Sequence, residues 1–150
     1  MPGQPAEMTA YLVNSAPGQD PVTLVSASLI PISGHPTGRL VGLAVARDHD
    51  GVAAARGWPP RGVPFRAFPG ALLPRGQSNI IFGFEGAQAG RDYMTAGLKI
   101  AYRYHGQLYT VLSWSSAVTC VTPDRNASMS ACERASEVAK RATEQMAGVH

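Results

Sequence analysis

The chain has 150 residues, the size of a single domain, and its 45% hydrophobic and 15% charged residues suffice for a packed core. This balance argues against a disordered chain, and no apolar run approaches the roughly 20 residues of a transmembrane helix, so we expect no membrane span. The net charge of +3 comes from basic residues scattered along the chain, and we therefore expect no nucleic-acid partner.

Alternating apolar residues bounded by turn residues predict three strands in the first third of the chain, at 8–14, 21–32 and 38–47. In the second strand the apolar positions change parity between Leu24 and Leu29, which predicts a β-bulge near Ser26. In the third strand small residues occupy alternate positions from Gly42 onward. Asp50-Gly51 then predicts a hairpin turn.

The segment 56–76 differs in composition, because five of the twelve prolines fall within it. Since proline lacks an N–H donor, we expect an extended connection that crosses from one sheet to the other rather than a central strand. Aromatic residues and arginines interleave here, as they do at interface hot spots. We therefore expect a binding surface formed by Trp58, Arg61, Phe65, Arg66 and Phe68. The alternative is that the aromatic residues close the edge of the sandwich while the arginines face water.

The predicted β region ends with one more strand and a hairpin, at 78–86, 96–104 and 107–118. The hairpin turns at His105-Gly106. The first arm has one apolar face, formed by Leu98, Ile100, Tyr102 and Tyr104. The second arm is apolar on both faces, so we expect it to be buried on both sides or nearly so.

A change to helical spacing follows and predicts one helix within 127–148. Its apolar stripe is narrow and mostly alanine: Ala131, Ala135, Val138, Ala139, Ala142 and Met146. Ser130 and Glu133 fit a capping box at the start of this helix, and Gly148 fits a cap at its end.

The two cysteines, Cys120 and Cys132, flank the connection between the last strand and the helix. They lack the spacing and histidine partners of a zinc site. We expect one disulfide here, which would stabilise the chain by about 3 kcal/mol on the chain-entropy model. The alternative is two unrelated buried thiols in a cytosolic protein. The start Met1–Gln4 is polar and lacks the apolar region of a signal peptide, so we expect any export to depend on a signal or anchor outside this chain.

About seven short strands and one closing helix predict an all-β domain over 1–150, with a sandwich at 8–120 and a helix at 127–148. An immunoglobulin-like two-sheet sandwich fits this pattern best. A small closed β-barrel plus a helix is the alternative, because strand count does not separate the two folds.

Residues able to carry chemistry are few. The sequence has no nucleophile elbow, and His35, His49 and His105 all lie in turn segments, so we expect no catalytic residues and no cofactor. Asp48-His49-Asp50 is a small cluster of possible metal ligands, but nothing in the sequence supplies a further ligand. We therefore expect no metal.

Three short patterns carry a resemblance to a known class of proteins. The run Gly97–Tyr109 resembles the final hairpin of small immunoglobulin-like ectodomains of actinobacterial membrane-anchored and secreted proteins. Asn14 followed by Pro21–Leu24 is similar to their first hairpin, and Ile80–Gly83 to their central strand. The resemblance implies an extracellular or envelope location, usually with an anchor before the domain, and implies no catalytic residues.

We therefore expect a non-enzymatic module of the bacterial envelope, or outside the cell, that contacts another envelope protein through 56–76. The alternative function belongs to the barrel: binding or cyclising an apolar metabolite in a lumen lined by Tyr102, Tyr104, Tyr109 and Trp114.

Overall fold

The structure is a computed structural model, and it describes residues 6–14, 20–46, 55–56, 58–59, 62, 64–86, 91–120 and 125–148. Six long strands run through these residues: β1 (Ala6–Asn14), β2 (Val22–Ile30), β3 (Arg39–Ala46), β7 (Gly76–Glu85), β8 (Tyr93–Tyr104) and β9 (Gln107–Thr119). Three short strands lie in the proline-rich connection: β4 (Ala55–Arg56), β5 (Phe65–Ala67) and β6 (Leu72–Leu73). One helix, α1 (Arg125–Ala147), follows them.

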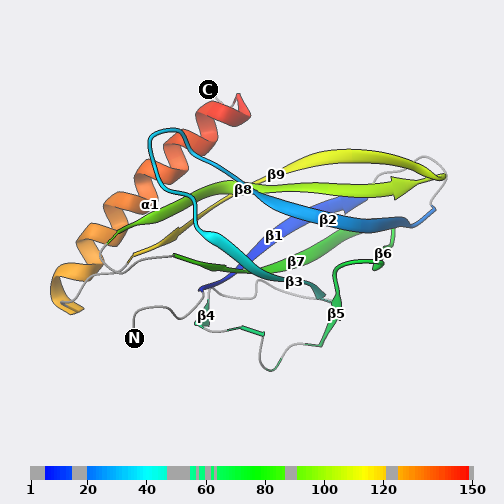
Figure 1. The fold of residues 1–150 in the computed structure, drawn as a ribbon, viewed down its shortest axis with the longest axis horizontal. Helices are drawn as coiled ribbons and strands as arrows, with labels where there is room; N and C mark the ends of the chain where they lie inside the picture. The colour runs from blue at the N-terminus through cyan, green and yellow to red at the C-terminus, as the bar shows by residue number, and fades with distance from the viewer. Residues whose placement is uncertain are drawn as a thin grey trace.

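The strands form two antiparallel sheets, in the orders β4-β1-β7-β3-β5 and β6-β2-β8-β9. Figure 1 shows these sheets as two layers, with α1 at one end of the molecule. The orders β1-β7-β3 and β9-β8-β2 match strands B-E-D and G-F-C of the immunoglobulin fold. The predicted immunoglobulin-like sandwich is thus confirmed, and the closed barrel is wrong for the strands that the structure describes.

The core lies between the two sheets and is built by alternate residues of the central strands. Ile80, Phe82 and Phe84 of β7 are fully buried, and Leu98 and Ile100 of β8 meet them from the other sheet. Each set occupies one face of its strand, as the period-two pattern predicts.

The proline-rich connection crosses between the sheets, as predicted. Its strand β5 pairs with β3 in the first sheet, and β6 pairs with β2 in the second. The crossing docks at the predicted bulge in β2, where the register shifts between Leu24 and Ser26. There the N–H of Leu24 donates to the carbonyl of Ala71 at 2.9 Å, and the N–H of Gly70 donates to the carbonyl of Leu24 at 2.8 Å. The bulge is thus bonded to the connection.

The helix lies on the outer face of the second sheet, where the buried Ala135 and Ala139 pack with Ile30, Met94 and Ala96. Two predictions about it are wrong. The helix begins at Arg125, so Ser130 lies inside it and does not cap it, and Val138 and Met146 are exposed. The end is as predicted, because Gly148 follows the last helical residue with φ +72°, a left-handed conformation that suits glycine.

Candidate functional site

The most exposed run of large apolar side chains lies on β9. Five of them expose more than a third of their surface: Leu108 (58%), Tyr109 (42%), Val111 (39%), Leu112 (45%) and Trp114 (36%). We call these five residues the edge surface. The prediction that this arm is buried on both sides is therefore wrong.

The reason for this exposure is the position of β9 in its sheet. Among the described strands, β9 pairs with β8 on one side and ends the sheet on the other. None of its 13 residues is charged or proline. Natural proteins usually protect a long open edge with lysine, proline or a short strand, because its unpaired N–H and C=O groups are a template for another strand. The first eight residues of β9, up to Trp114, pair with β8 without a bulge.

The hairpin turn settles which backbone groups face the open side. His105 and Gly106 both have positive φ, 48° and 76°, as a two-residue type I′ turn requires. Such a turn makes the flanking pair, Tyr104 and Gln107, a hydrogen-bonded pair. Since bonded and non-bonded pairs alternate along an antiparallel ladder, the N–H and C=O groups on the open side belong to Leu108, Thr110, Leu112 and Trp114.

The edge surface has members on both faces of the sheet. Tyr109 lies opposite Tyr102 on the core side, with ring centroids 5.6 Å apart. Leu112 lies opposite the exposed Lys99 on the outer side. Trp114 is an odd number of residues from Tyr109 in a regular strand and so points to the outer side. The barrel alternative placed these two residues in one lumen, which this arrangement does not allow.

The tip of the hairpin is tied to the start of β2. Nε2 of His105 lies 2.8 Å from Oδ2 of Asp20, and the imidazole ring lies 4.1 Å from the ring of Tyr104, centroid to centroid. Both members of the pair are well exposed, so the pair orders the turn more than it stabilises the fold.

The four described residues of the binding set predicted in 56–76 differ in how far they are exposed. Trp58 is half-buried, and its ring lies against Gly42 and Gly83. Arg66 is half-buried and donates from Nη2 to the carbonyl of Leu72 at 3.1 Å. Phe65 is exposed (42%). Arg61 lies outside the described residues.

Phe68, the fifth member of that set, is fully buried in the core between the sheets. A side chain in this position cannot touch a partner in the folded protein, so its inclusion in the binding set is wrong. The alternative interpretation of the segment, in which aromatic residues close the edge of the sandwich, describes Phe68 but not Trp58. Trp58 instead covers Gly42 and Gly83 on the face of the first sheet that points away from the core. The edge surface was missed because apolar residues on both faces of a strand indicate either complete burial or an open edge. A strand buried on both faces lacks charge as well, so the uncharged sequence of β9 does not separate the two cases.

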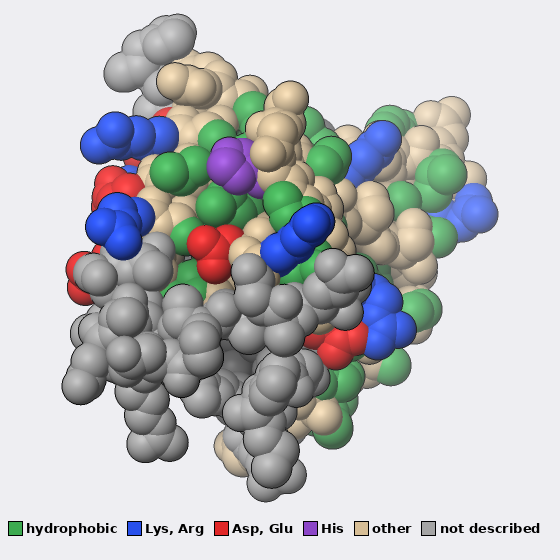
Figure 2. Space-filling view, turned by 60° about the vertical axis from the view of Figure 1, so that its left-hand side comes forward, with side chains coloured by type: hydrophobic (Ala, Val, Ile, Leu, Met, Phe, Trp, Pro, Cys, Tyr) green, Lys and Arg blue, Asp and Glu red, His purple; other side chains and the backbone are tan. Residues whose placement is uncertain are grey.

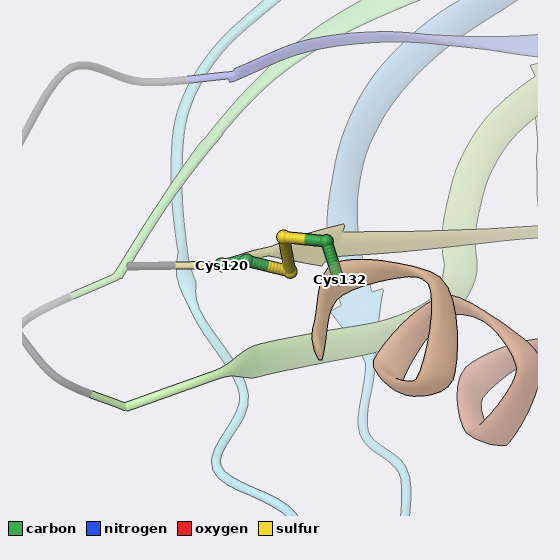
Figure 3. Close-up of a disulfide and its surroundings, with 2 residues drawn as sticks. All are labelled: Cys120 and Cys132. Carbon is green, nitrogen blue, oxygen red and sulfur yellow. A yellow bond between two sulfur atoms is a disulfide. The ribbon is translucent and has the colours of Figure 1, made fainter. Parts of the chain in front are cut away.

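The predicted disulfide is present. Cys120, directly after β9, is bonded to Cys132 of α1, with Cα atoms 5.6 Å apart, and Figure 3 shows this bond. The bond adjoins the contact between α1 and the sheet, because Cys120 packs against the same apolar cluster as Ala135. It therefore holds the helix on the sheet.

The described residues contain no group of three or more histidine, cysteine, aspartate or glutamate side chains placed to hold a metal ion. The cluster Asp48-His49-Asp50 lies outside them. No helix among the described residues is long and apolar enough to cross a membrane. On the face shown in Figure 2, the described positive and negative side chains are interspersed rather than gathered by sign.

No family model matches the chain, and no curated protein and no solved structure matches it. The fold and the site themselves define the class: an immunoglobulin-like β-sandwich with a disulfide-bonded C-terminal helix and an open, uncharged edge strand.

Proposed function

We propose that the chain is a non-enzymatic binding module of the bacterial envelope or the extracellular space, and that it acts by protein–protein contact. The observation that carries this proposal is the edge surface: five large apolar side chains exposed along one uncharged strand. Apolar patches of this kind on soluble domains mark interaction sites, since leaving them in water is unfavourable.

The disulfide supports the location. Cys120 and Cys132 are the two cysteines of the chain and are bonded to each other. Structural disulfides persist in oxidising compartments such as the periplasm and the extracellular space, whereas the cytosol keeps thiols reduced. The bonded pair therefore favours a protein that works outside the cytoplasm.

The edge surface is a better binding site than the segment 56–76. In that segment Trp58 and Phe68 are held by the fold, which leaves Phe65 as the exposed aromatic residue among those described. The edge surface instead combines an exposed tryptophan and an exposed tyrosine with three aliphatic side chains. Its outward-facing backbone groups also pair with no other strand that the structure describes. Aromatic anchors of this kind dominate the energetics of protein interfaces.

The test is site-specific photo-crosslinking in the native cell. A photoreactive residue at Leu112 is expected to give a discrete covalent adduct with a protein. The matched control places the same residue at Ser136, an exposed position on α1, where no such adduct is expected. Adding Leu108→Lys to the Leu112 probe is expected to remove the adduct, because a charge on an open edge opposes association. Equal labelling at Leu112 and Ser136, or none at either, contradicts the proposal.

A further inference from the structure

We propose that the edge surface pairs with the edge surface of a second copy of this chain, so that two β9 strands join antiparallel about a two-fold axis at Val111. This inference rests on the proposed function of the edge surface as a protein-binding site and names its partner. The pairing of the two β9 strands joins the four-stranded sheets of the two copies into one continuous sheet.

The pattern of exposure indicates an edge contact rather than a face contact. Leu112 and Trp114 are exposed on the outer side of the sheet, while Tyr109 and Val111 are exposed on the core side. A flat partner such as a lipid surface would cover the outer face alone and would leave Tyr109 and Val111 in water. A strand added beside β9 covers side chains of both faces at once.

The N–H and C=O groups on the open side of β9 can form hydrogen bonds with the same groups of a second copy. The regular part of the strand runs from Gln107 to Trp114 and ends where the register shifts. Its outward-facing groups belong to residues 108, 110, 112 and 114. A two-fold axis at Val111 places Leu108 opposite Trp114 of the second copy, and Thr110 opposite Leu112 of the second copy. Every outward-facing residue of the run then has a hydrogen-bonding partner, and a shift of the axis by one residue leaves some without one.

The side chains agree with this register. On the outer face the tryptophan of each copy meets the leucine at position 108 of the other. On the core side Val111 meets its own equivalent, and Tyr109 lies over the backbone at Ser113 of the second copy, whose side chain is buried within its own domain. A contact between identical surfaces brings equal charges together, so charged residues on β9 would oppose it. The strand carries none, and Lys99 and Arg103, which lie opposite Leu112 and Leu108, are one strand away on β8.

The size of the contact indicates a reversible dimer. At about 150–250 Å² for a large side chain, the exposed fractions of 36–58% correspond to roughly 400 Å² per copy. The two copies then bury at most about 800 Å² in total, which lies in the range of transient complexes. We therefore expect a dimer that dissociates on dilution.

The test is a cysteine at the axis. Across the axis Val111 and its equivalent form a non-hydrogen-bonded pair, with Cα atoms about 4.5 Å apart, and this separation suits a disulfide. Purified Val111→Cys protein is expected to form a covalent dimer on mild oxidation. The control is Leu72→Cys, which is exposed on β6 at the opposite edge of the same sheet and is expected to stay monomeric. No covalent dimer, or equal dimer formation in the control, overturns the inference.

Two further variants test the same contact without a crosslink. Thr110→Pro removes an N–H that faces the open side, so the pairing of β9 with β8 is retained while strand addition is blocked. Leu112→Lys places a charge on the edge. Each is expected to weaken the dimer at least about tenfold in sedimentation, because symmetry puts the substitution into the interface twice. Unchanged self-association in both variants overturns the inference.

The outcomes separate this inference from the proposed function. If the purified chain stays monomeric while the Leu112 probe captures a different protein, the second-copy inference is overturned and the proposed function is supported. If the Leu112 probe captures nothing, both are overturned. Binding of the monomeric chain to vesicles of anionic phospholipid, without dimers in sedimentation, also overturns the second-copy inference.

Discussion

At the scale of single residues, Trp58 shows why an aromatic residue in a proline-rich connection need not bind anything. Its ring lies across Gly42 and Gly83, which are directly opposite each other in β3 and β7. A methyl group at either glycine would overlap the ring. Two strands thus lack side chains where the connection crosses them, and the indole covers the bare backbone.

We expect Trp58→Ala to lower the free energy of unfolding by about 2–4 kcal/mol, somewhat less than for a fully buried tryptophan because Trp58 is half-buried. Urea denaturation measures the change. Phe65→Ala is the matched control from the same connection, and we expect it to cost less than about 1 kcal/mol, since Phe65 is exposed. Equal effects of the two substitutions would show that the packing of Trp58 does not stabilise the fold.

Gly97 is a second residue whose identity the backbone dictates. Its φ is +143°, and a Cβ at this position would collide with the carbonyl oxygen of Ser113 on β9. We expect Gly97→Ala to cost about 2–5 kcal/mol, from backbone strain and overpacking together. Gly106 also has a positive φ, but a Cβ there would meet no other atom. We therefore expect Gly106→Ala to lower the free energy of unfolding by about 1–2 kcal/mol, from backbone strain alone. Thermal unfolding of both variants checks this order, and a smaller loss for Gly97→Ala would contradict it.

At the scale of elements, the sequence was sufficient for strands whose two faces differ. Ile80, Phe82 and Phe84 form one face of β7, whereas the other face has Ile81 as its one large apolar residue. The common face of the three residues and their burial could therefore be predicted. The same reasoning failed for β9, where both faces are apolar. Period-two patterns report which residues share a face, but they contain no information on whether a strand has a neighbour on each side. The site depends on that neighbour, so it could not be predicted.

The helix is the element whose stability depends most on one bond. Its buried contacts include the small side chains Ala135 and Ala139, which bury little apolar surface. The disulfide closes a short loop, with 12 residues of separation, and stabilises by about 3 kcal/mol on the chain-entropy model. Loss of the bond should therefore affect α1 before it affects the sandwich.

We expect the double variant Cys120→Ser, Cys132→Ser to open α1 more often while the two sheets stay folded. Amide hydrogen exchange measures this, and the amides of α1 should exchange about a hundredfold faster, with smaller changes in β7 and β8. Ser136→Ala, at an exposed position of the same helix, is the control and should leave exchange unchanged. Uniform acceleration over helix and strands would show instead that the bond stabilises the domain as one unit.

At the scale of the whole molecule, the order of the strands sets β9 apart from its neighbours in sequence, β7 and β8. The strands β7 and β8 lie inside their sheets, whereas β9 forms an edge and then leads through Cys120 into the bonded helix. One end of β9 is therefore held by the disulfide, and the hairpin at the other end is held by the pair of His105 and Asp20. Between these ends, the run from Gln107 to Trp114 has no bulge and carries exposed side chains, which suits strand addition.

The oxidation state of the two cysteines in the native cell tests whether the protein works outside the cytoplasm. We expect protein isolated from that cell, then denatured and treated with a thiol-alkylating reagent without reductant, to carry no alkyl group. Its intact mass should be lower than that of the reduced chain by two hydrogen atoms, because Cys120 and Cys132 are bonded. Alkylation after reduction is the control, and it should add two groups, one for each cysteine. Alkylation of both cysteines before reduction would place the chain in a reducing compartment, and the proposed location would then be wrong. The self-pairing of the edge surface does not depend on this result, because it is tested on the purified protein.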